Sequence, residues 1–321
     1  MQLDASPTVA GTRILGLGHY RPDNVITNDD LVARGVDTND EWVRTRVGII
    51  ERRWADPNES IVDMGEQAAS KALANSGVAA SDVDLVLVAT CTMPTPVPSA
   101  APNVANRLGM RAPAAYDVSS GCSGFVYALA AASTAVLAGQ ARHVLVVASE
   151  RFSGWLNPDD RGTYVILADG AGAAVVGPSA TPGIGPVVAG SDGAQWDTIA
   201  IDEDTRYFRQ EGGAVYRWAT SQMAPIGLEA CRRAGVAPED ITAFVPHQAN
   251  LRIIDALARR IGLPNAKVAD DIVTSGNTSA ASIPLALSRM AERGEIASGA
   301  PVLLLGFGSG LAYAGQVVLA P

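Results

Sequence analysis

Short apolar runs rich in β-branched residues alternate along the chain with longer stretches whose apolar residues recur at helical spacing. The runs predict buried strands at residues 85–89, 144–147, 173–176 and 302–305. The longer stretches predict helices at residues 63–75, 124–138, 218–234, 251–261 and 282–293. The polar stretch 196–213 predicts a surface loop or flap. Strands that alternate with helices are typical of an α/β fold, in which helices cover buried sheets.

Segments of the two halves resemble each other at a nearly constant offset. Residues 77–88 resemble 235–246, and residues 143–148 resemble 301–306, both at an offset of 158. Residues 117–122 lie opposite 271–277 at a similar offset. Chance similarity between βα units is the alternative, but three matches in the same order favour duplication. We therefore expect an N-terminal half of residues 1–178 and a C-terminal half of residues 179–321, with Cys122 and Asn277 in equivalent places.

The composition permits a large core and argues against several classes of partner. Hydrophobic residues make up 48% of the 321 residues and charged residues 18%, which predicts a folded protein. The net charge of −9 argues against non-specific nucleic-acid binding. Apolar runs are far shorter than the ~20 residues of a membrane helix, and residues 1–11 carry no signal-peptide pattern. We therefore expect neither nucleic acid nor membrane as a partner.

The three cysteines and three histidines do not show the spacing of a disulfide framework or a metal site. This pattern fits a reducing compartment, so we expect a cytoplasmic protein without a bound metal. Four of these residues lack the local frame of a reactive site. The residues interpreted as structural are Cys91, Cys231, His19 and His143.

Glycines lie close on both sides of Cys122 in residues 119–125, and an apolar helical pattern follows. A thiol in the first turn of a helix lies where unpaired N–H groups and the helix dipole favour negative charge. The sequence therefore predicts a lowered pKa and a reactive thiolate at Cys122. The glycines would let a substrate approach closely. A buried structural cysteine is the alternative.

His247 and Asn277 lie where active sites gather in α/β folds. His247 follows a predicted strand and precedes a predicted helix. Asn277 follows Gly276 and precedes an alanine-rich helical pattern. A structural histidine and a helix-capping asparagine are the alternatives, and capping does not exclude a second role for Asn277.

The chain resembles the β-ketoacyl-acyl-carrier-protein synthase III family of the thiolase superfamily from about residue 13 to the C-terminus. The motifs that carry the resemblance are residues 40–48, 119–125, 160–163, 169–173, 246–250, 276–282 and 306–310. The family has a five-layered α-β-α-β-α fold built from a duplicated βαβαβαββ unit, in agreement with the repeat. The resemblance implies an acyltransferase that condenses an acyl-CoA starter with malonyl-acyl carrier protein, which initiates fatty-acid biosynthesis.

The resemblance also implies roles for single residues. Cys122 takes the acyl group from acyl-CoA, and His247 and Asn277 then donate hydrogen bonds to the thioester carbonyl of the malonyl group. Loss of CO2 leaves a carbanion that attacks the acyl-cysteine, and the backbone N–H groups of Cys122 and Ser309 form the oxyanion hole. The mechanism requires no metal or redox cofactor. Many relatives have glycine at the position of Ser309, which a backbone donor tolerates.

Binding residues are implied in the same way. Residues matching the CoA site are Trp42, Arg46 and Arg161. A basic patch for the acidic carrier protein is expected at Arg217, Arg252, Arg259 and Arg260. Val97 matches a position that lines the acyl pocket of the partner subunit in a homodimer, where some relatives carry phenylalanine. Because the side chain at Val97 is smaller and segment 196–213 is shorter than in several relatives, the sequence does not define which starter acyl group the pocket accepts.

Other functions remain open from the sequence. A relative that primes polyketide synthesis, or one that transfers the acyl group from Cys122 to another acceptor, would carry the same residues. A non-catalytic subunit is disfavoured because Cys122, His247 and Asn277 occur together. A nicotinamide-dinucleotide site is disfavoured because Gly16 and Gly18 lack the third glycine of the phosphate-binding pattern.

Overall fold

The structure, a computed structural model, describes residues 9–321 and is built on two five-stranded sheets. The expectation about a signal peptide falls largely on residues outside this range. The strands of the first sheet, in spatial order, are β1 (Gly11–Tyr20), β7 (Asp169–Ser179), β6 (Val144–Arg151), β4 (Leu85–Ala89) and β5 (Ala114–Val118). Those of the second are β8 (Val188–Ser191), β14 (Ala312–Leu319), β13 (Pro301–Gly308), β11 (Ala243–Pro246) and β12 (Lys267–Val268).

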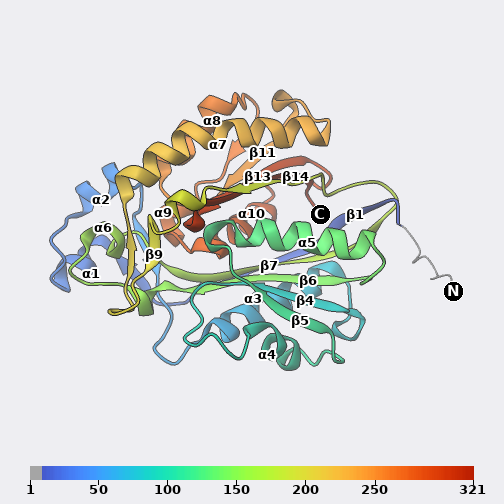
Figure 1. The fold of residues 1–321 in the computed structure, drawn as a ribbon, viewed down its shortest axis with the longest axis horizontal. Helices are drawn as coiled ribbons and strands as arrows, with labels where there is room; N and C mark the ends of the chain where they lie inside the picture. The colour runs from blue at the N-terminus through green and yellow to red at the C-terminus, as the bar shows by residue number, and fades with distance from the viewer. Residues whose placement is uncertain (1–8) are drawn as a thin grey trace.

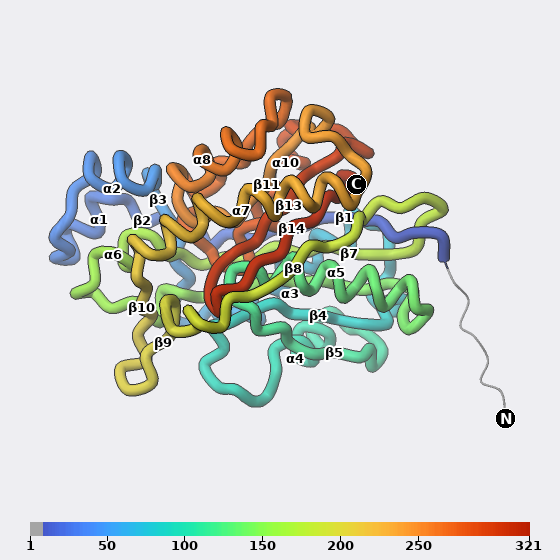
Figure 2. The backbone as a smooth tube through the Cα atoms, turned by 45° about the horizontal axis from the view of Figure 1, so that its top comes forward, coloured from blue at the N-terminus to red at the C-terminus, as the bar shows by residue number. Residues whose placement is uncertain are grey.

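The two sheets have the same strand order when they are matched in chain order. In each, a parallel core is extended by antiparallel strands, and Figure 2 shows β11, β13, β14 and β8 lying side by side. The predicted half boundary at residue 178 lies at the end of β7, and β8 starts the second sheet at Val188. This matching confirms the duplicated unit inferred from the repeat.

Helices form three layers around the sheets (Figure 1). The central layer is α5 (Gly124–Leu137) and α10 (Ser282–Glu292), which contact strands of both sheets. The outer face of the first sheet is covered by α3 (Ile61–Ser76) and α4 (Ala100–Arg107). The second is covered by α7 (Gly212–Ala234), against which α8 (Leu251–Ile261) packs. The result is the expected five-layered α-β-α-β-α arrangement.

Short elements complete the end of the molecule that contains the candidate site. They include a small sheet of β2 (Val25–Thr27) and β3 (Glu51–Arg53), and a hairpin of β9 (Ile199–Ile201) and β10 (Phe208–Gln210). The short helices are α1 (Asn28–Ala33), α2 (Asp40–Arg46), α6 (Arg161–Tyr164) and α9 (Ile272–Ser275). Among residues 9–321, no helix combines the length and apolar character needed to cross a bilayer.

Local sequence explains the boundaries of the main helices. Ser60 and Asp63 form a capping box at the start of α3, and Gly77 ends that helix with a φ of 69°. The central helix α5 is almost wholly apolar because it is buried between two sheets. In contrast, α8 has one buried face, with Ile253 and Leu257 turned to the core.

The predicted strands and helices are confirmed, with two corrections. Residues 196–213 form the β9–β10 hairpin and the start of α7, so of the two expected forms, a loop or a flap, the structure has the flap. Helix α7 starts at Gly212, earlier than the predicted residue 218, because the glycines at 212 and 213 hide the helical pattern. Strand β1 was not among the predicted strands, since its glycines interrupt the apolar run.

One hydrophobic core joins the two halves. It contains Leu87 and Val146 from the first sheet, Leu304 from the second, and Leu129 and Leu287 from the central helices. These side chains are fully buried and belong to a single cluster. The ends of the central helices are therefore held by both sheets, which positions the residues that precede α5 and α10.

Candidate active site

A cavity of about 420 Å³ brings together the three residues predicted to carry the chemistry. Cys122, His247 and Asn277 all line it, although they are far apart in the sequence. Its apolar wall contains Phe152, Phe208 and Phe307. A thiol, an imidazole and an amide therefore converge in one cavity.

Cys122 lies in a single 3-10 turn, Gly121–Ser123, that leads directly into α5. Gly121 has a φ of 48°, and a Cβ atom there would lie 2.0 Å from Ser309 Oγ. A Cβ atom on Gly308 would lie 2.9 Å from Cys122 Sγ. Close packing between this turn and the end of β13 therefore requires glycine at both positions.

The pKa of Cys122 is shifted in the direction opposite to the one expected from the sequence. The net effect of its surroundings raises the pKa of the thiol to about 12: burial is the main cause, the hydroxyl of Ser279 lowers the pKa in part, and the nearby carboxylate of Glu150 adds to the rise. The helix-dipole argument was wrong on balance because it ignores removal of the thiol from water. The cysteine is partly exposed by surface area, but its sulfur is surrounded by protein. Thiolate formation therefore needs help from neighbouring groups.

His247 follows β11 and is held on three sides. Its backbone N–H donates to Leu305 O at 2.8 Å, and its ring packs edge-to-face on Phe307 with centroids 5.4 Å apart. Its Nδ1 atom lies 2.8 Å from Ser282 Oγ on α10. Burial lowers the pKa of His247 to about 3, so the imidazole is neutral at physiological pH.

The hydrogen bonds at Ser282 favour one tautomer of His247. Ser282 Oγ accepts the backbone N–H of Gln248 at 3.2 Å. If His247 also donated to Ser282, the hydroxyl proton would have no acceptor among residues 9–321. The hydroxyl therefore donates to Nδ1, and the proton of the imidazole lies on Nε2 as a hydrogen-bond donor.

Asn277 is fixed through its backbone and its side-chain oxygen. Its N–H donates to Ile166 O at 2.9 Å, and its carbonyl accepts from the N–H of Ala168 at 2.9 Å. Asn277 Oδ1 accepts the N–H of Ser279 at 2.8 Å in a local turn, whereas Thr278 occupies the cap position of the 3-10 turn Ser279–Ala281. The helix-capping alternative is therefore not found, and the occupied oxygen leaves the Nδ2 amide hydrogens of Asn277 to donate into the cavity.

The residues matched to a CoA site lie at the exposed end of the cavity. Trp42 and Arg46 line it, on α2. The Arg161 guanidinium stacks on the Trp42 ring at 4.6 Å and donates to Asp37 O at 2.8 Å. An aromatic face and guanidinium groups are thus grouped at one opening, which suits a flat base and phosphates.

The four arginines of the predicted basic patch are exposed on the adjacent helices α7 and α8. The Arg252 guanidinium stacks on Tyr216 at 5.5 Å, and Arg260 donates to Thr220 O. These contacts join the two helices, with Arg217 near the start of α7 and Arg259 near the end of α8. Arg252 itself lines the cavity, so the patch continues to its opening.

Two other predicted positions differ in their relation to the cavity. Ser309 directly follows Gly308, which packs against Cys122, and its backbone nitrogen would lie 3.4 Å from a Cβ atom on Gly121, the residue before Cys122. Val97 is 76% exposed and does not line the cavity of its own chain. The hairpin supplies Ile199 and Phe208 to the cavity wall, so residues 196–213 do cover the site as expected.

The sequence analysis did not identify the buried polar side chains next to Cys122, which are those of Ser279, Cys91 and Glu150. Ser279 lines the cavity, with Oγ 3.5 Å from Cys122 Sγ and 3.8 Å from Cys91 Sγ. Cys91, interpreted as structural, donates to Glu150 Oε1 at 3.2 Å. The one available signal was a glutamate at the end of a strongly apolar strand, β6.

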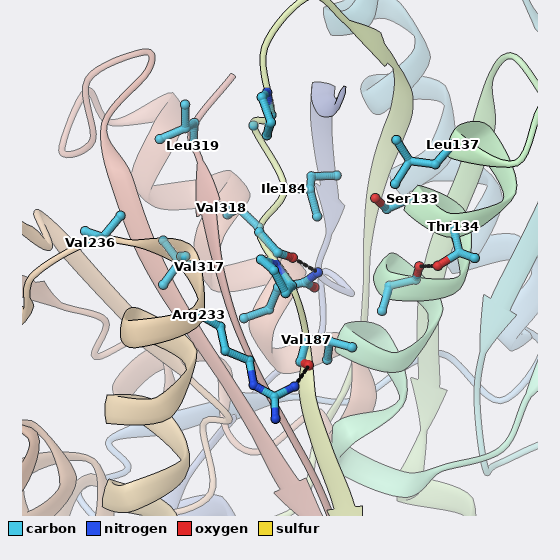
Figure 3. Close-up of a pocket in the computed structure, with 17 residues that line it drawn as sticks. Ser133, Thr134, Leu137, Ile184, Val187, Arg233, Val236, Val317, Val318 and Leu319 are labelled. Carbon is cyan, nitrogen blue, oxygen red and sulfur yellow. Dashed lines mark hydrogen bonds between the residues drawn. The ribbon is translucent and has the colours of Figure 1, made fainter. Parts of the chain in front are cut away.

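A larger cavity of about 560 Å³ lies elsewhere, between α5, residues 182–187 and β14 (Figure 3). Apolar side chains such as Ile184, Val317 and Leu319 line it, and Arg233 there donates to Val187 O at 3.2 Å. It contains no cysteine or histidine, so size does not identify the active site. Within residues 9–321, no cluster of three His, Cys, Asp or Glu side chains is placed to bind a metal.

Comparisons with known proteins agree with this geometry. Residues 116–193 match the family model of 3-oxoacyl-[acyl-carrier-protein (ACP)] synthase III, and residues 231–319 match its C-terminal model. The chain is 52% identical to β-ketoacyl-[acyl-carrier-protein] synthase III 2 of Streptomyces avermitilis, covering 97% of this chain and 99% of that one. It is 46% identical to the mycobacterial synthase III of Mycobacterium tuberculosis, covering 98% of both chains.

Solved structures show the same fold. The priming β-ketosynthase from the R1128 polyketide biosynthetic pathway has a TM-score of 0.96 and 42% identity, covering 100% of this chain and 98% of that one. The 3-oxoacyl-(acyl carrier protein) synthase III of Pseudomonas aeruginosa has a TM-score of 0.92 and 38% identity, covering 97% and 98%. With the thiol, imidazole and amide gathered in one cavity, these matches show that the chain belongs to the 3-oxoacyl-[acyl-carrier-protein] synthase III family of condensing acyltransferases.

Proposed function

We propose that the chain condenses an acyl-CoA with malonyl-acyl carrier protein through an acyl group carried on Cys122. The observation that carries this proposal is that Cys122, His247 and Asn277 line one cavity whose opening bears Trp42 and Arg46. The names of the relatives support the carrier protein as the second substrate. The reaction initiates a fatty-acid chain.

The first half-reaction is acyl transfer to the enzyme. Cys122 attacks the thioester carbonyl of acyl-CoA, and the CoA thiolate leaves. Backbone N–H groups of Cys122 and Ser309 stabilise the oxyanion, and the apolar wall with Phe208 and Phe307 receives the acyl chain. Trp42, Arg46 and Arg161 bind the nucleotide end.

The second half-reaction is decarboxylation followed by carbon–carbon bond formation. His247 Nε2–H and the Asn277 amide donate to the thioester carbonyl of the malonyl group, where negative charge develops as CO2 leaves. Both donors are held in place before substrate binds, His247 by Ser282 and Asn277 by Ser279. The carbanion then attacks the acyl-cysteine. These steps use only groups of the chain and the two substrates, so no metal or redox cofactor is needed.

The acyl carrier protein docks, in this proposal, on the basic patch across α7 and α8. Arg252 continues the patch to the cavity, which places a docked carrier beside the opening. Carrier proteins are acidic, so the association is electrostatic and weakened by salt. This docking reconciles an enzyme of net charge −9 with an acidic partner.

A homodimer is part of the proposal. Strand β5 forms an edge of the first sheet and presents Tyr116, which is 48% exposed. An unpaired edge of this kind is suited to pairing with a second copy. Val97 is exposed near α4, and in a dimer it would reach the acyl pocket of the other subunit. The three free cysteines support a reducing cytoplasmic location.

Release of CO2 from malonyl-acyl carrier protein in the presence of acyl-CoA tests the main proposal. We expect CO2 release, a β-ketoacyl product and an acyl adduct on Cys122 in the intact enzyme. C122A should form no adduct, whereas C231A should form it as wild type does. Acyl transfer to another acceptor without CO2 release would contradict condensation.

Priming of a polyketide chain is the second candidate, and likeness to the R1128 priming β-ketosynthase favours it. Both candidates use the same residues, so the starter group distinguishes them. A panel of acyl-CoA substrates, read as mass added to Cys122, measures the preference. Acylation followed by transfer to a dedicated second carrier protein would favour polyketide priming.

A further inference from the structure

A buried carboxyl group, Glu150, lies behind Cys122 and has no role in the chemistry described above. Its Oε2 atom accepts hydrogen bonds from Thr92 Oγ1 at 2.6 Å and Thr90 Oγ1 at 3.1 Å. The backbone N–H of Cys91 also donates to it at 3.1 Å, and the thiol of Cys91 donates to Oε1 at 3.2 Å. Glu150 accepts every one of these bonds, so the surroundings are arranged for a carboxylate.

A chain of hydrogen bonds connects this carboxylate to Cys122, and its direction follows from counting protons. Cys91 has one thiol proton, which it gives to Glu150. Its contact with Ser279 Oγ, at 3.8 Å, therefore has Ser279 as the donor. Because Ser279 also has one proton, its contact with Cys122 Sγ at 3.5 Å has Cys122 as the donor. The bonds all point from Cys122 toward Glu150.

Ser279 is held in a strained conformation at the centre of this chain. Its φ is +51°, in the left-handed region that residues other than glycine rarely adopt. The side chain of Ser279 is buried, and the backbone N–H of this residue donates to Asn277 Oδ1. Backbone strain of this kind is typical of functional sites. Here it places the hydroxyl between the two sulfur atoms.

Burial limits the negative charge that these groups carry together. Desolvation raises the pKa of Glu150 and of Cys122, and the negative charge of Glu150 further raises that of Cys122. The pKa of Cys91 lies well above its usual value, and His247 is neutral. The titratable groups around Cys122 are thus Cys91, Glu150 and His247, and while the thiol of Cys122 is protonated the single negative charge of this group lies on Glu150.

We propose that Glu150 is the proton acceptor for Cys122, acting as a positioning residue through Ser279 and Cys91. The S–H bond of Cys122 breaks as an O–H bond forms on Ser279. The former Ser279 proton moves to Cys91 Sγ, and the Cys91 proton moves to Glu150. The electron pair stays on Cys122 Sγ, and the buried negative charge moves from carboxylate to thiolate without a second charge being created.

This proposal rests on the proposed acylation of Cys122. Protons balance over one catalytic cycle of acylation and condensation. The thiolate attacks the acyl thioester, a new S–C bond forms, and the departing thiolate of CoA takes a proton from solvent. Glu150 keeps the original proton while Cys122 is acylated. When condensation expels Cys122 as a thiolate, the proton returns along the same chain, so each cycle takes up one solvent proton.

Alkylation of Cys122 by iodoacetamide tests this link without any substrate of the enzyme. The thiol–carboxylate and thiolate–carboxylic acid forms bind equal numbers of protons, so their ratio is independent of pH between the two pKa values of the pair. We expect a wild-type alkylation rate that is flat across neutral pH. In E150Q, the thiolate forms only by losing a proton to solvent, so the rate should rise about tenfold per pH unit.

The same rising profile in both proteins, or a flat profile in both, would overturn the proposal. Mass spectrometry of the peptides assigns the adduct to Cys122 rather than to Cys91. Because no CoA or carrier protein is present, failure here leaves the condensation assay as a separate test of function.

The pair C91S and C91A gives a second test that keeps Glu150, in case E150Q does not fold. A serine hydroxyl can pass a proton as the thiol does, whereas alanine breaks the chain. We expect acyl transfer to Cys122 in a rapid-mixing experiment to be close to wild type in C91S and reduced at least about fivefold in C91A, the loss of roughly one hydrogen bond. Equal rates in the two variants would contradict the relay.

Discussion

His247 Nδ1 lies 2.8 Å from Ser282 Oγ, and this contact orients the imidazole so that Nε2–H faces the cavity. His247 directly follows β11 and Ser282 begins α10, and these two elements belong to different layers of the C-terminal half. The contact matters because the decarboxylation step needs a donor at Nε2. A histidine in the other tautomer would present an acceptor to the developing negative charge.

Removal of the Ser282 hydroxyl should therefore slow decarboxylation. In S282A the two tautomers become closer in energy, and we expect CO2 release to fall roughly tenfold, the effect of about one hydrogen bond. Acylation of Cys122 should remain near wild type, because His247 is not required for that step. S288A is the matched control, since Ser288 on the same helix bonds His19 Nδ1 at 2.9 Å outside the cavity. Equal loss in both variants would point to helix destabilisation.

Because its imidazole is buried, His247 should not titrate in the pH profile of CO2 release. The pKa of His247 is lowered to about 3, so its neutral form persists as the pH falls through the usual histidine range near 6.5. We expect CO2 release by enzyme already acylated on Cys122 to be unchanged between about pH 8 and 5. A loss with a midpoint near pH 6.5 would show that His247 titrates in water-like surroundings.

Gly308 should not tolerate a side chain. A Cβ atom at this position would lie 2.8 Å from Cys122 Cβ and 2.9 Å from its sulfur, so G308A must push the nucleophile out of place. We expect adduct formation to fall more than about tenfold and the free energy of unfolding to fall by about 1–3 kcal/mol. G154A is the control, because a Cβ there meets no atom within 4 Å. Adduct formation by G308A at the wild-type rate would contradict the geometry.

Trp42 should contribute to CoA binding rather than to chemistry. W42A removes the ring that stacks with Arg161 at 4.6 Å, so we expect the KM for acyl-CoA to rise roughly tenfold with kcat little changed. The KM for an acyl thioester without the nucleotide should not change. W196A removes a tryptophan that is 68% exposed outside the cavity and serves as the control. Equal effects on both thioesters would argue against a base-stacking role.

Asp169 should make stability depend on pH. This buried carboxyl accepts from Ala55 N, Ser153 N and Ser153 Oγ, yet burial raises its pKa to about 6. The unfolded chain loses this proton near pH 4, earlier than the native state, so the free energy of unfolding falls as the pH rises from about 4 to 6. The contribution is about 3 kcal/mol.

Urea unfolding of wild type and D169N across this range isolates the carboxyl. Partly buried histidines such as His19, with a pKa lowered to about 4, act in the opposite direction but are shared by both proteins. We expect the free energy of unfolding of wild type, relative to that of D169N, to fall as the pH rises. A difference that is constant with pH would contradict the raised pKa.

Local patterns predicted the elements and the three chemical groups, because each is marked by its near neighbours in the sequence. Cys122 is framed by glycines, and His247 and Asn277 follow short motifs beside strand and helix patterns. The convergence of these groups followed from the repeat and the resemblance, which place both halves around one centre. The predictions that were wrong concern properties set by contacts between residues far apart in the sequence.

The lowered pKa expected for Cys122 is the clearest example. A helix start can be read from the chain, whereas burial of the sulfur depends on Gly308 and on layers that are remote in sequence. Ser279 was missed for a similar reason, since a positive φ at a serine leaves no pattern. Cys91 was assigned a structural role because its contact with Glu150 joins residues from two different strand ends.

The shared core has a consequence for how the chain can be divided. Leu87 and Val146 pack in the same cluster as Leu287 and Leu304, so neither half can cover its inner sheet face alone. A fragment ending near residue 178 would expose this apolar surface to water and would be prone to aggregation. The two halves share one strand arrangement, yet each needs the other to bury its inner sheet face.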